Sequence, residues 1–157
     1  MTSNIEIIQT FYTAFQKKDY KTMQDCYAPN AVFSDEVFQN LNASQVKAMW
    51  EMLIKAGKDL ELEFKNVQAT GTTGSAEWIA TYTFSATNRK VTNRIKANFT
   101  FNNGKIVQHT DRFNFYAWAK QALGMPGLLL GWTGSLKQKV QQKAMQNLDA
   151  FMQKNKM

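Results

Sequence analysis

The sequence predicts an α+β fold, in which a curved antiparallel sheet is covered on its apolar side by N-terminal helices. Two periodicities indicate this class. Apolar residues recur at helical spacing over residues 4–56, and they alternate with polar residues from Leu60 to Phe115, as in strands with one buried face. Short polar turns separate the alternating segments, which favours hairpin connections and therefore antiparallel strands.

The first expected helix begins after Ser3, which forms a capping-box pattern with Glu6. Its apolar stripe consists of Ile5, Ile8, Phe11, Tyr12 and Phe15. Asp19 is placed to cap a short second helix that runs to Tyr27. Pro29 ends that helix, because the residue before a proline is pushed out of the helical region.

An extended segment is expected over residues 31–38, before a third helix that starts at a cap within residues 42–44. The apolar side chains that point inward from this helix are Val46, Met49, Trp50, Leu53 and Ile54. Gly57 follows the last of these residues, where a helix commonly ends.

Four strands are expected after this helix, and the turns between them carry residues that tolerate positive φ. Asn102, Asn103 and Gly104 are the strongest hairpin signal. The last strand runs from Lys105 to Phe115 and places one set of alternate side chains on the apolar face of the sheet. That set is Val107, His109, Asp111, Phe113 and Phe115.

The chain of 157 residues is expected to form one domain over residues 1–157. Residues 1–116 would make the sheet and its helices, and residues 117–157 a helical C-terminal extension. The extension contains apolar residues around Leu128 and Trp132 that are unfavourable in water. It could cover the open end of the sheet, pack on its outer face, or form a dimer contact.

Composition excludes several classes of protein. The net charge is +7, but many lysines lie in the C-terminal helix, and basic residues do not interleave with aromatic ones, so nucleic acid is not an expected partner. No segment is long and apolar enough to span a membrane, and the N-terminus lacks a signal sequence. We therefore expect a cytoplasmic protein with no membrane partner.

The chain holds one cysteine, Cys26, and one histidine, His109, so a disulfide or a zinc cluster is not expected, and most metal-ligand sets are unavailable. His109 nevertheless lies two residues from Asp111 on the core face of a strand. A buried carboxylate is unfavourable unless it is paired or lies beside a cavity. This pair is either an acid/base site or a satisfied polar pair in the core. Asp35 is a second, weaker candidate in the segment after residues 31–33.

These segments resemble the nuclear transport factor 2-like superfamily, which includes ketosteroid isomerase, limonene epoxide hydrolase and the SnoaL-like polyketide cyclases. Residues 28–35 are similar to the family segment that ends in the general base of ketosteroid isomerase, which corresponds to Asp35. Residues 104–111 are similar to the family's last strand, where Asp111 matches a catalytic Asp of limonene epoxide hydrolase. The resemblance covers about residues 3–116 and implies a cone-shaped sheet.

The chain departs from two of these enzymes. Phe11 stands where the isomerase has an oxyanion-hole Tyr, although Tyr12 is adjacent, and neither Lys96 nor Ala97 replaces the second donor. Residues 77–81 lack the Arg and Asp that the epoxide hydrolase requires. The resemblance thus implies a cofactor-independent cyclase or isomerase in which Asp111 transfers a proton, His109 assists it, and Asp35 is a second base or polar anchor.

Aromatic side chains are expected to line a pocket for a small apolar ligand that contains a carbonyl group, or else to form an ordinary core. They are Phe11, Tyr12, Phe15, Trp50, Trp78, Phe99 and Phe113. The resemblance also implies a homodimer. The alternative function is a non-catalytic ligand-binding or interaction module of the same fold.

Overall fold

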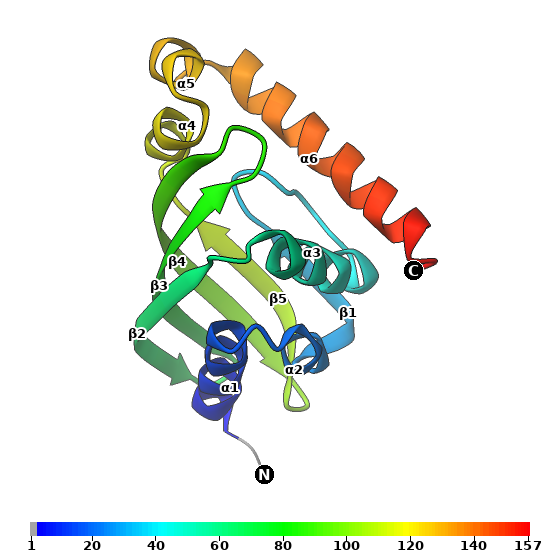
Figure 1. Ribbon diagram of the computed structural model, residues 1–157. Helices are drawn as coiled ribbons and strands as arrows, with labels where there is room; N and C mark the ends of the chain where they lie inside the picture. Colours follow the sequence, from blue (N-terminus) through cyan, green and yellow to red (C-terminus); the bar gives the residue numbers. More distant parts are fainter. Residues whose placement is uncertain (1–2) are drawn as a thin grey trace.

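The structure is a computed structural model that describes residues 3–157 (Figure 1). It confirms the α+β class. The elements, in chain order, are α1 (Asn4–Gln16), α2 (Tyr20–Asp25), β1 (Tyr27–Ser34), α3 (Ala43–Ala56), β2 (Glu61–Thr70), β3 (Thr73–Phe84), β4 (Arg89–Asn102), β5 (Lys105–Arg112), α4 (Phe115–Leu123), α5 (Met125–Leu130) and α6 (Gly134–Lys154). No helix within these residues is long and apolar enough to cross a bilayer.

The sheet has five strands in the order β1-β5-β4-β3-β2, whereas the sequence predicted four. The additional strand is β1, which pairs with β5 in parallel and places Phe33 opposite His109. The prediction of a second helix reaching Tyr27 was wrong, because α2 ends at Asp25 and the chain then enters the sheet. Pro29 is tolerated within β1 because an edge strand does not need every amide for the sheet.

The helix starts follow from side-chain caps. Ser3 Oγ accepts from the Glu6 amide at 3.2 Å, which is one half of the predicted capping box. Asp19 caps α2 as predicted, and Asn42 forms a full capping box with Gln45 at the start of α3. These caps fix where the helices begin over the concave face of the sheet.

A bulge changes which residues of β5 face the core. Thr100 pairs with Gln108 but Phe101 pairs with Ile106, so Val107 is an extra residue on β5. Ile106 is consequently fully buried, and Val107, which the strict alternation placed in the core, is only half-buried. Beyond the bulge the predicted alternation holds, and His109 and Asp111 both lie on the core face.

The strand β5 ends at Arg112, three residues earlier than predicted, and Phe115 begins α4. Helix α4 packs against β4, and α6 lies along α3, across the open end of the curved sheet (Figure 1). Leu148 is the α6 residue that is fully buried, and it joins the main core. The extension therefore covers the open end, which is one of the three arrangements that the sequence allowed.

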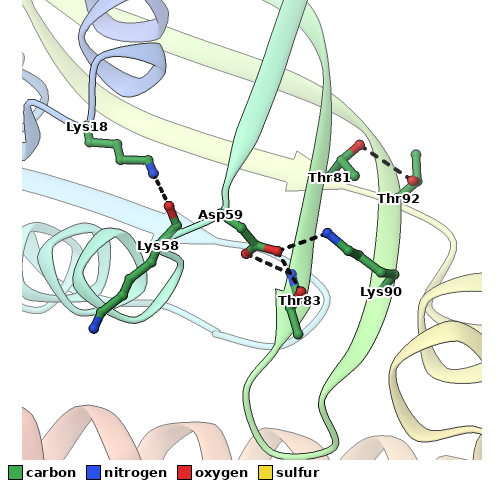
Figure 2. Close-up of polar contacts among 7 residues, drawn as sticks. All are labelled: Lys18, Lys58, Asp59, Thr81, Thr83, Lys90 and Thr92. Carbon is green, nitrogen blue, oxygen red and sulfur yellow. Dashed lines mark hydrogen bonds and ion pairs between the residues drawn. The ribbon is translucent and has the colours of Figure 1, made fainter.

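The loop between α3 and β2 is tied to the neighbouring strands by Asp59, as Figure 2 shows. Its two carboxylate oxygens accept from the Thr83 amide at 3.1 Å and the Thr83 hydroxyl at 2.6 Å, and Lys90 Nζ lies 3.1 Å away. These bonds, those from Thr83 above all, hold the pKa of Asp59 well below its usual value. Lys18 Nζ donates to the carbonyl of the preceding Lys58, so the loop is held from both sides.

Candidate active site

A chain of buried hydrogen bonds connects α3, β1 and β5. Trp50 Nε1 donates to Tyr27 Oη at 2.9 Å, and Tyr27 Oη lies 2.8 Å from His109 Nδ1. On the other side of the imidazole, His109 Nε2 lies 2.9 Å from Asp111 Oδ1. His109 has no exposed surface and Asp111 is 2% exposed, so water does not compete for these bonds.

The geometry assigns a direction to every proton in this chain. Trp50 can only donate, so Tyr27 Oη accepts from it and gives its own proton to His109 Nδ1. Burial raises the pKa of Tyr27 well above its usual value, which keeps that proton on the phenol. His109 Nδ1 is then an acceptor, and the remaining ring proton is on Nε2 and is donated to Asp111. The arrangement thus favours a neutral imidazole and an accepting carboxylate.

Aromatic rings enclose the imidazole. Phe99, Phe33 and Phe11 have ring centroids 4.3, 5.0 and 5.7 Å from that of His109. These rings exclude water from His109, so the imidazole is a support for Asp111 and does not itself reach a cavity. The two residues therefore form a satisfied polar pair, of which only Asp111 lines a cavity.

Asp111 lines a largely apolar cavity of about 690 Å³ on the concave side of the sheet. The cavity extends between the sheet, α3 and α6, and its walls also include α4 and the β3–β4 turn. A volume of this size accommodates a small organic molecule. Its polar lining includes Asp35, Asn93 and, from α6, Lys139 and Lys143.

Asp35 faces the same cavity from the segment that follows β1. Its Oδ1 accepts from the amides of Val37 at 2.7 Å and Phe38 at 2.6 Å, which closes a tight turn. Desolvation raises the pKa of Asp35 to about 7, the charge of Asp111 adds to this, and the two amide bonds act in the opposite direction. Asp35 therefore titrates near neutral pH, with a second carboxyl group facing the same cavity.

The predicted aromatic residues separate into two groups. Phe15, Trp50, Trp78 and Phe113 line the cavity, together with Asp35 and Asp111. Phe11, Tyr12 and Phe99 are instead buried in the core behind the cavity wall. The structure thus brings together both predicted carboxylates and four of the seven predicted aromatic residues.

Two buried polar atoms have no hydrogen-bond partner within residues 3–157, namely Trp78 Nε1 and Tyr12 Oη. Trp78 lines the cavity, but its Nε1 atom is itself buried, so a ligand reaches this donor only if the ring shifts. Tyr12 stacks on Phe64 with 5.4 Å between ring centroids, and desolvation, aided by the charge of Asp111, raises its pKa well above the usual value. An unpaired buried donor is unfavourable, and a ligand acceptor would relieve that cost at Trp78.

Sequence reasoning missed Tyr27 and Asn93 and the contribution of α6. Tyr27 carried no signal, because its contact with His109 spans 82 residues and depends on the parallel pairing of β1 with β5. Asn93 faces inward on β4 between Val91 and Ile95, and its position in the alternation could have identified it. Within the described residues, no three His, Cys, Asp or Glu side chains are grouped so as to hold a metal ion.

Comparison with known proteins places this site in a family. The family model for the SnoaL-like domain matches residues 8–109, more than half of the chain. The chain belongs to the SnoaL-like domain family. The match ends at His109, so Asp111 lies just beyond it. Among curated proteins, none matches this SnoaL-like chain.

Solved structures show the same fold at low sequence identity. A putative polyketide cyclase from Pseudomonas putida KT2440 is 16% identical with a TM-score of 0.66, over 78% of this chain and 99% of that one. TerC, co-crystallised with polyporic acid, is 16% identical with a TM-score of 0.64, over 75% of this chain and 96% of that one. An epoxide hydrolase of M. tuberculosis that resembles limonene epoxide hydrolase is 19% identical to this chain with a TM-score of 0.60, over 81% of this chain and 90% of that one. These similarities establish the cone-shaped fold. The activity has to be inferred from the chemistry of the site, because one fold supports many activities.

Proposed function

We propose that this SnoaL-like protein binds a small apolar molecule that contains a carbonyl group and catalyses proton transfer beside that group. The observation that carries the proposal is the pair of carboxyl groups in one apolar cavity. Asp111 Oδ1 lies 2.9 Å from His109 Nε2, and the pKa of Asp35 is raised to about 7. Two carboxyl groups in different environments can act as base and acid at the same pH. The polyketide cyclase of the same fold is in keeping with this chemistry.

In the proposed reaction, the Asp111 carboxylate removes a proton from the carbon next to the carbonyl group. The C–H bond breaks, its electron pair forms the enolate, and Asp111 becomes the neutral acid. His109 remains neutral and positions Asp111, because Tyr27 occupies its other nitrogen. If a C=C bond is conjugated with the enolate, Asp111 returns the proton at the γ-carbon and the double bond shifts, which is isomerisation. If the substrate carries a second carbonyl group, the enolate carbon attacks it, and the resulting alkoxide takes the proton from Asp111, which closes a ring and restores the carboxylate.

The developing charge on the carbonyl oxygen requires a hydrogen-bond donor. The Trp78 side chain lines the cavity, and its buried Nε1 donor has no partner in the described structure. Protonated Asp35 is a second candidate, since a carboxyl group with a pKa of about 7 is in its acid form for part of the time at neutral pH. The aromatic walls supply the apolar contacts that a flat ligand requires.

The test uses 2-tetralone, a flat apolar ketone with acidic protons next to its carbonyl group. Binding is followed by quenching of tryptophan fluorescence, because Trp50 and Trp78 line the cavity. Catalysis is followed by NMR as the loss of the α-proton signal in D₂O. We expect the wild type to accelerate the exchange, and Asp111→Asn to lower the rate about 100-fold or more while still binding 2-tetralone.

Asp149→Asn is the matched control, because Asp149 is an exposed carboxylate on α6. This variant should bind 2-tetralone and catalyse the exchange of its α-protons as the wild type does. Exchange at the wild-type rate in Asp111→Asn would refute the role of Asp111. Binding by the wild type without any acceleration of exchange would instead support the alternative, a non-catalytic ligand carrier.

A further inference from the structure

The turn between α4 and α6 exposes a cluster of large apolar side chains that the cavity does not use. We call it the apolar tip, and it consists of Met125, Leu128, Leu129, Leu130 and Trp132. Trp132 is 74% exposed and Leu129 is 60% exposed. A soluble surface rarely exposes so many large apolar side chains together, and such a patch marks a contact with another surface.

The apolar tip is held in place by tight packing behind it. A Cβ atom on Gly127 would lie only 2.0 Å from the Ala119 carbonyl oxygen, so glycine lets α5 lie directly on α4. Tyr116 Oη donates to the Leu128 carbonyl oxygen at 2.9 Å, which holds the same turn from α4. Gly127 is buried, whereas the three leucines that follow it are exposed. Helix α5, which carries them, lies at one end of the molecule (Figure 1).

The segment that carries the apolar tip is basic in sequence, although Glu36 forms an ion pair with one of its lysines, Lys137, at 3.0 Å. Residues 112–148 contain five basic residues and no acidic residue. Lys120 on α4 is exposed, and Lys139 and Lys143, which also line the cavity, are exposed farther along α6. A second copy of this chain, seated symmetrically on the same patch, would bring two such basic segments together. An anionic lipid surface matches both features, because its headgroups attract the basic residues and its acyl chains accept the apolar side chains.

We propose that the apolar tip docks this protein on an anionic lipid surface. Trp132 and the leucines enter the interface between headgroups and acyl chains, and the lysines contact the phosphates. No spanning helix is required for such a contact. The expectation of no membrane partner came from the lack of a spanning segment and from the N-terminus, and it does not cover an interfacial contact.

The position of the apolar tip connects it with the cavity. Leu123 and Pro126, on either side of Gly124, line the cavity, as does Leu136 at the start of α6. Docking would therefore bring this side of the cavity next to the membrane, where apolar molecules dissolve. This last step rests on the proposed function, whereas the docking itself does not.

The test is flotation with vesicles of phosphatidylcholine and phosphatidylglycerol in equal parts, compared with phosphatidylcholine alone. Trp132 supplies a second readout, because Trp50, Trp78 and Trp118 are 2%, 6% and 6% exposed and already emit from buried sites. We expect binding to the anionic vesicles, a blue shift of the emission on binding, and release as the salt concentration rises.

The variant Leu129→Ser/Trp132→Ser should bind the anionic vesicles about tenfold less tightly or worse, since two inserted side chains are lost. Ile5→Ser is the matched control, because Ile5 is 39% exposed on α1 at the other end of the molecule (Figure 1). It should bind as the wild type does. Both readouts use protein without any cavity ligand, so a failure of 2-tetralone exchange leaves them unaffected.

Two results would overturn the proposal. One is equal flotation of the wild type and the Leu129→Ser/Trp132→Ser variant, or no flotation with anionic vesicles. The other is a blue shift of the wild-type emission that grows with protein concentration in the absence of lipid, together with a dimer in sedimentation that the double variant does not form. The apolar tip would then be a contact between two copies of this chain.

Discussion

Tyr27→Phe removes one oxygen atom from the centre of the buried hydrogen-bond chain. The ring remains, so the packing against Phe11 and His109 is preserved and only the polar contacts are lost. Two groups then lose their partner, Trp50 Nε1 and His109 Nδ1. Both residues are buried, at 2% and 0% exposure, and water cannot replace the phenol without a rearrangement.

The size of the effect follows from these two orphaned groups. A buried polar group left without a partner costs about 1–3 kcal/mol, so the loss of two partners in Tyr27→Phe should lower the free energy of unfolding by about 2–6 kcal/mol. The assay is urea unfolding at neutral pH, followed by circular dichroism. The same variant should also slow the exchange of 2-tetralone, because His109 is no longer held in the tautomer that donates to Asp111.

Tyr116→Phe is the control for the loss of a phenol hydroxyl. Its single bond, to the Leu128 carbonyl oxygen, lies at the surface, and the expected loss is at most about 1 kcal/mol. If Tyr27→Phe proves no more destabilising than Tyr116→Phe, the two buried groups do not depend on Tyr27. The direction that we assign to the protons in the chain would then be wrong.

Three further predictions concern the carboxyl groups and α6. The pKa of Asp35 in the folded state is raised to about 7, so between pH 4 and 7 the folded state holds a proton that the unfolded state has released, and the unfolding free energy should fall by at most about 4 kcal/mol over this range. In urea titrations at several pH values, Asp35→Asn should flatten this dependence. The pKa of Asp59 is lowered in the folded state, so the stabilisation of the fold by its carboxylate is present above about pH 4 and lost in acid. The difference in unfolding free energy between the wild type and Asp59→Ala should therefore shrink below about pH 4, and a difference independent of pH would contradict this prediction. Leu148→Ala should lower the unfolding free energy by about 2–5 kcal/mol and speed hydrogen exchange in α6, whereas Leu136→Ala, at a half-buried site of the same helix, should lower it less. Equal losses of unfolding free energy would show that Leu148 does not hold α6 in place.

The sequence was sufficient for the features that depend on local periodicity. The period of two placed His109 and Asp111 on the core face of the last strand, and the caps at Asp19 and Asn42 marked helix starts. The alternation also directed Trp78 to the concave face, where it lines the cavity.

Contacts between distant segments could not be predicted in this way. The parallel pairing of β1 with β5 brings Tyr27 to His109, and neither strand contains a signal for the other. The bulge at Val107 inverts the local alternation, since one extra residue exchanges the two faces. The place of α6 over the cavity depends on contacts with distant segments, such as the burial of Leu148 in the main core and the ion pair of Lys137 with Glu36.

The central claim is that Asp111 faces the cavity as a base because neutral His109 donates a hydrogen bond to it. Since His109 is the sole histidine of the chain, a long-range ¹H–¹⁵N spectrum of the wild type at neutral pH contains a single set of imidazole signals. We expect a neutral ring with its proton on Nε2 and an unprotonated Nδ1. A proton on Nδ1, or an imidazolium with both nitrogens protonated, would contradict it.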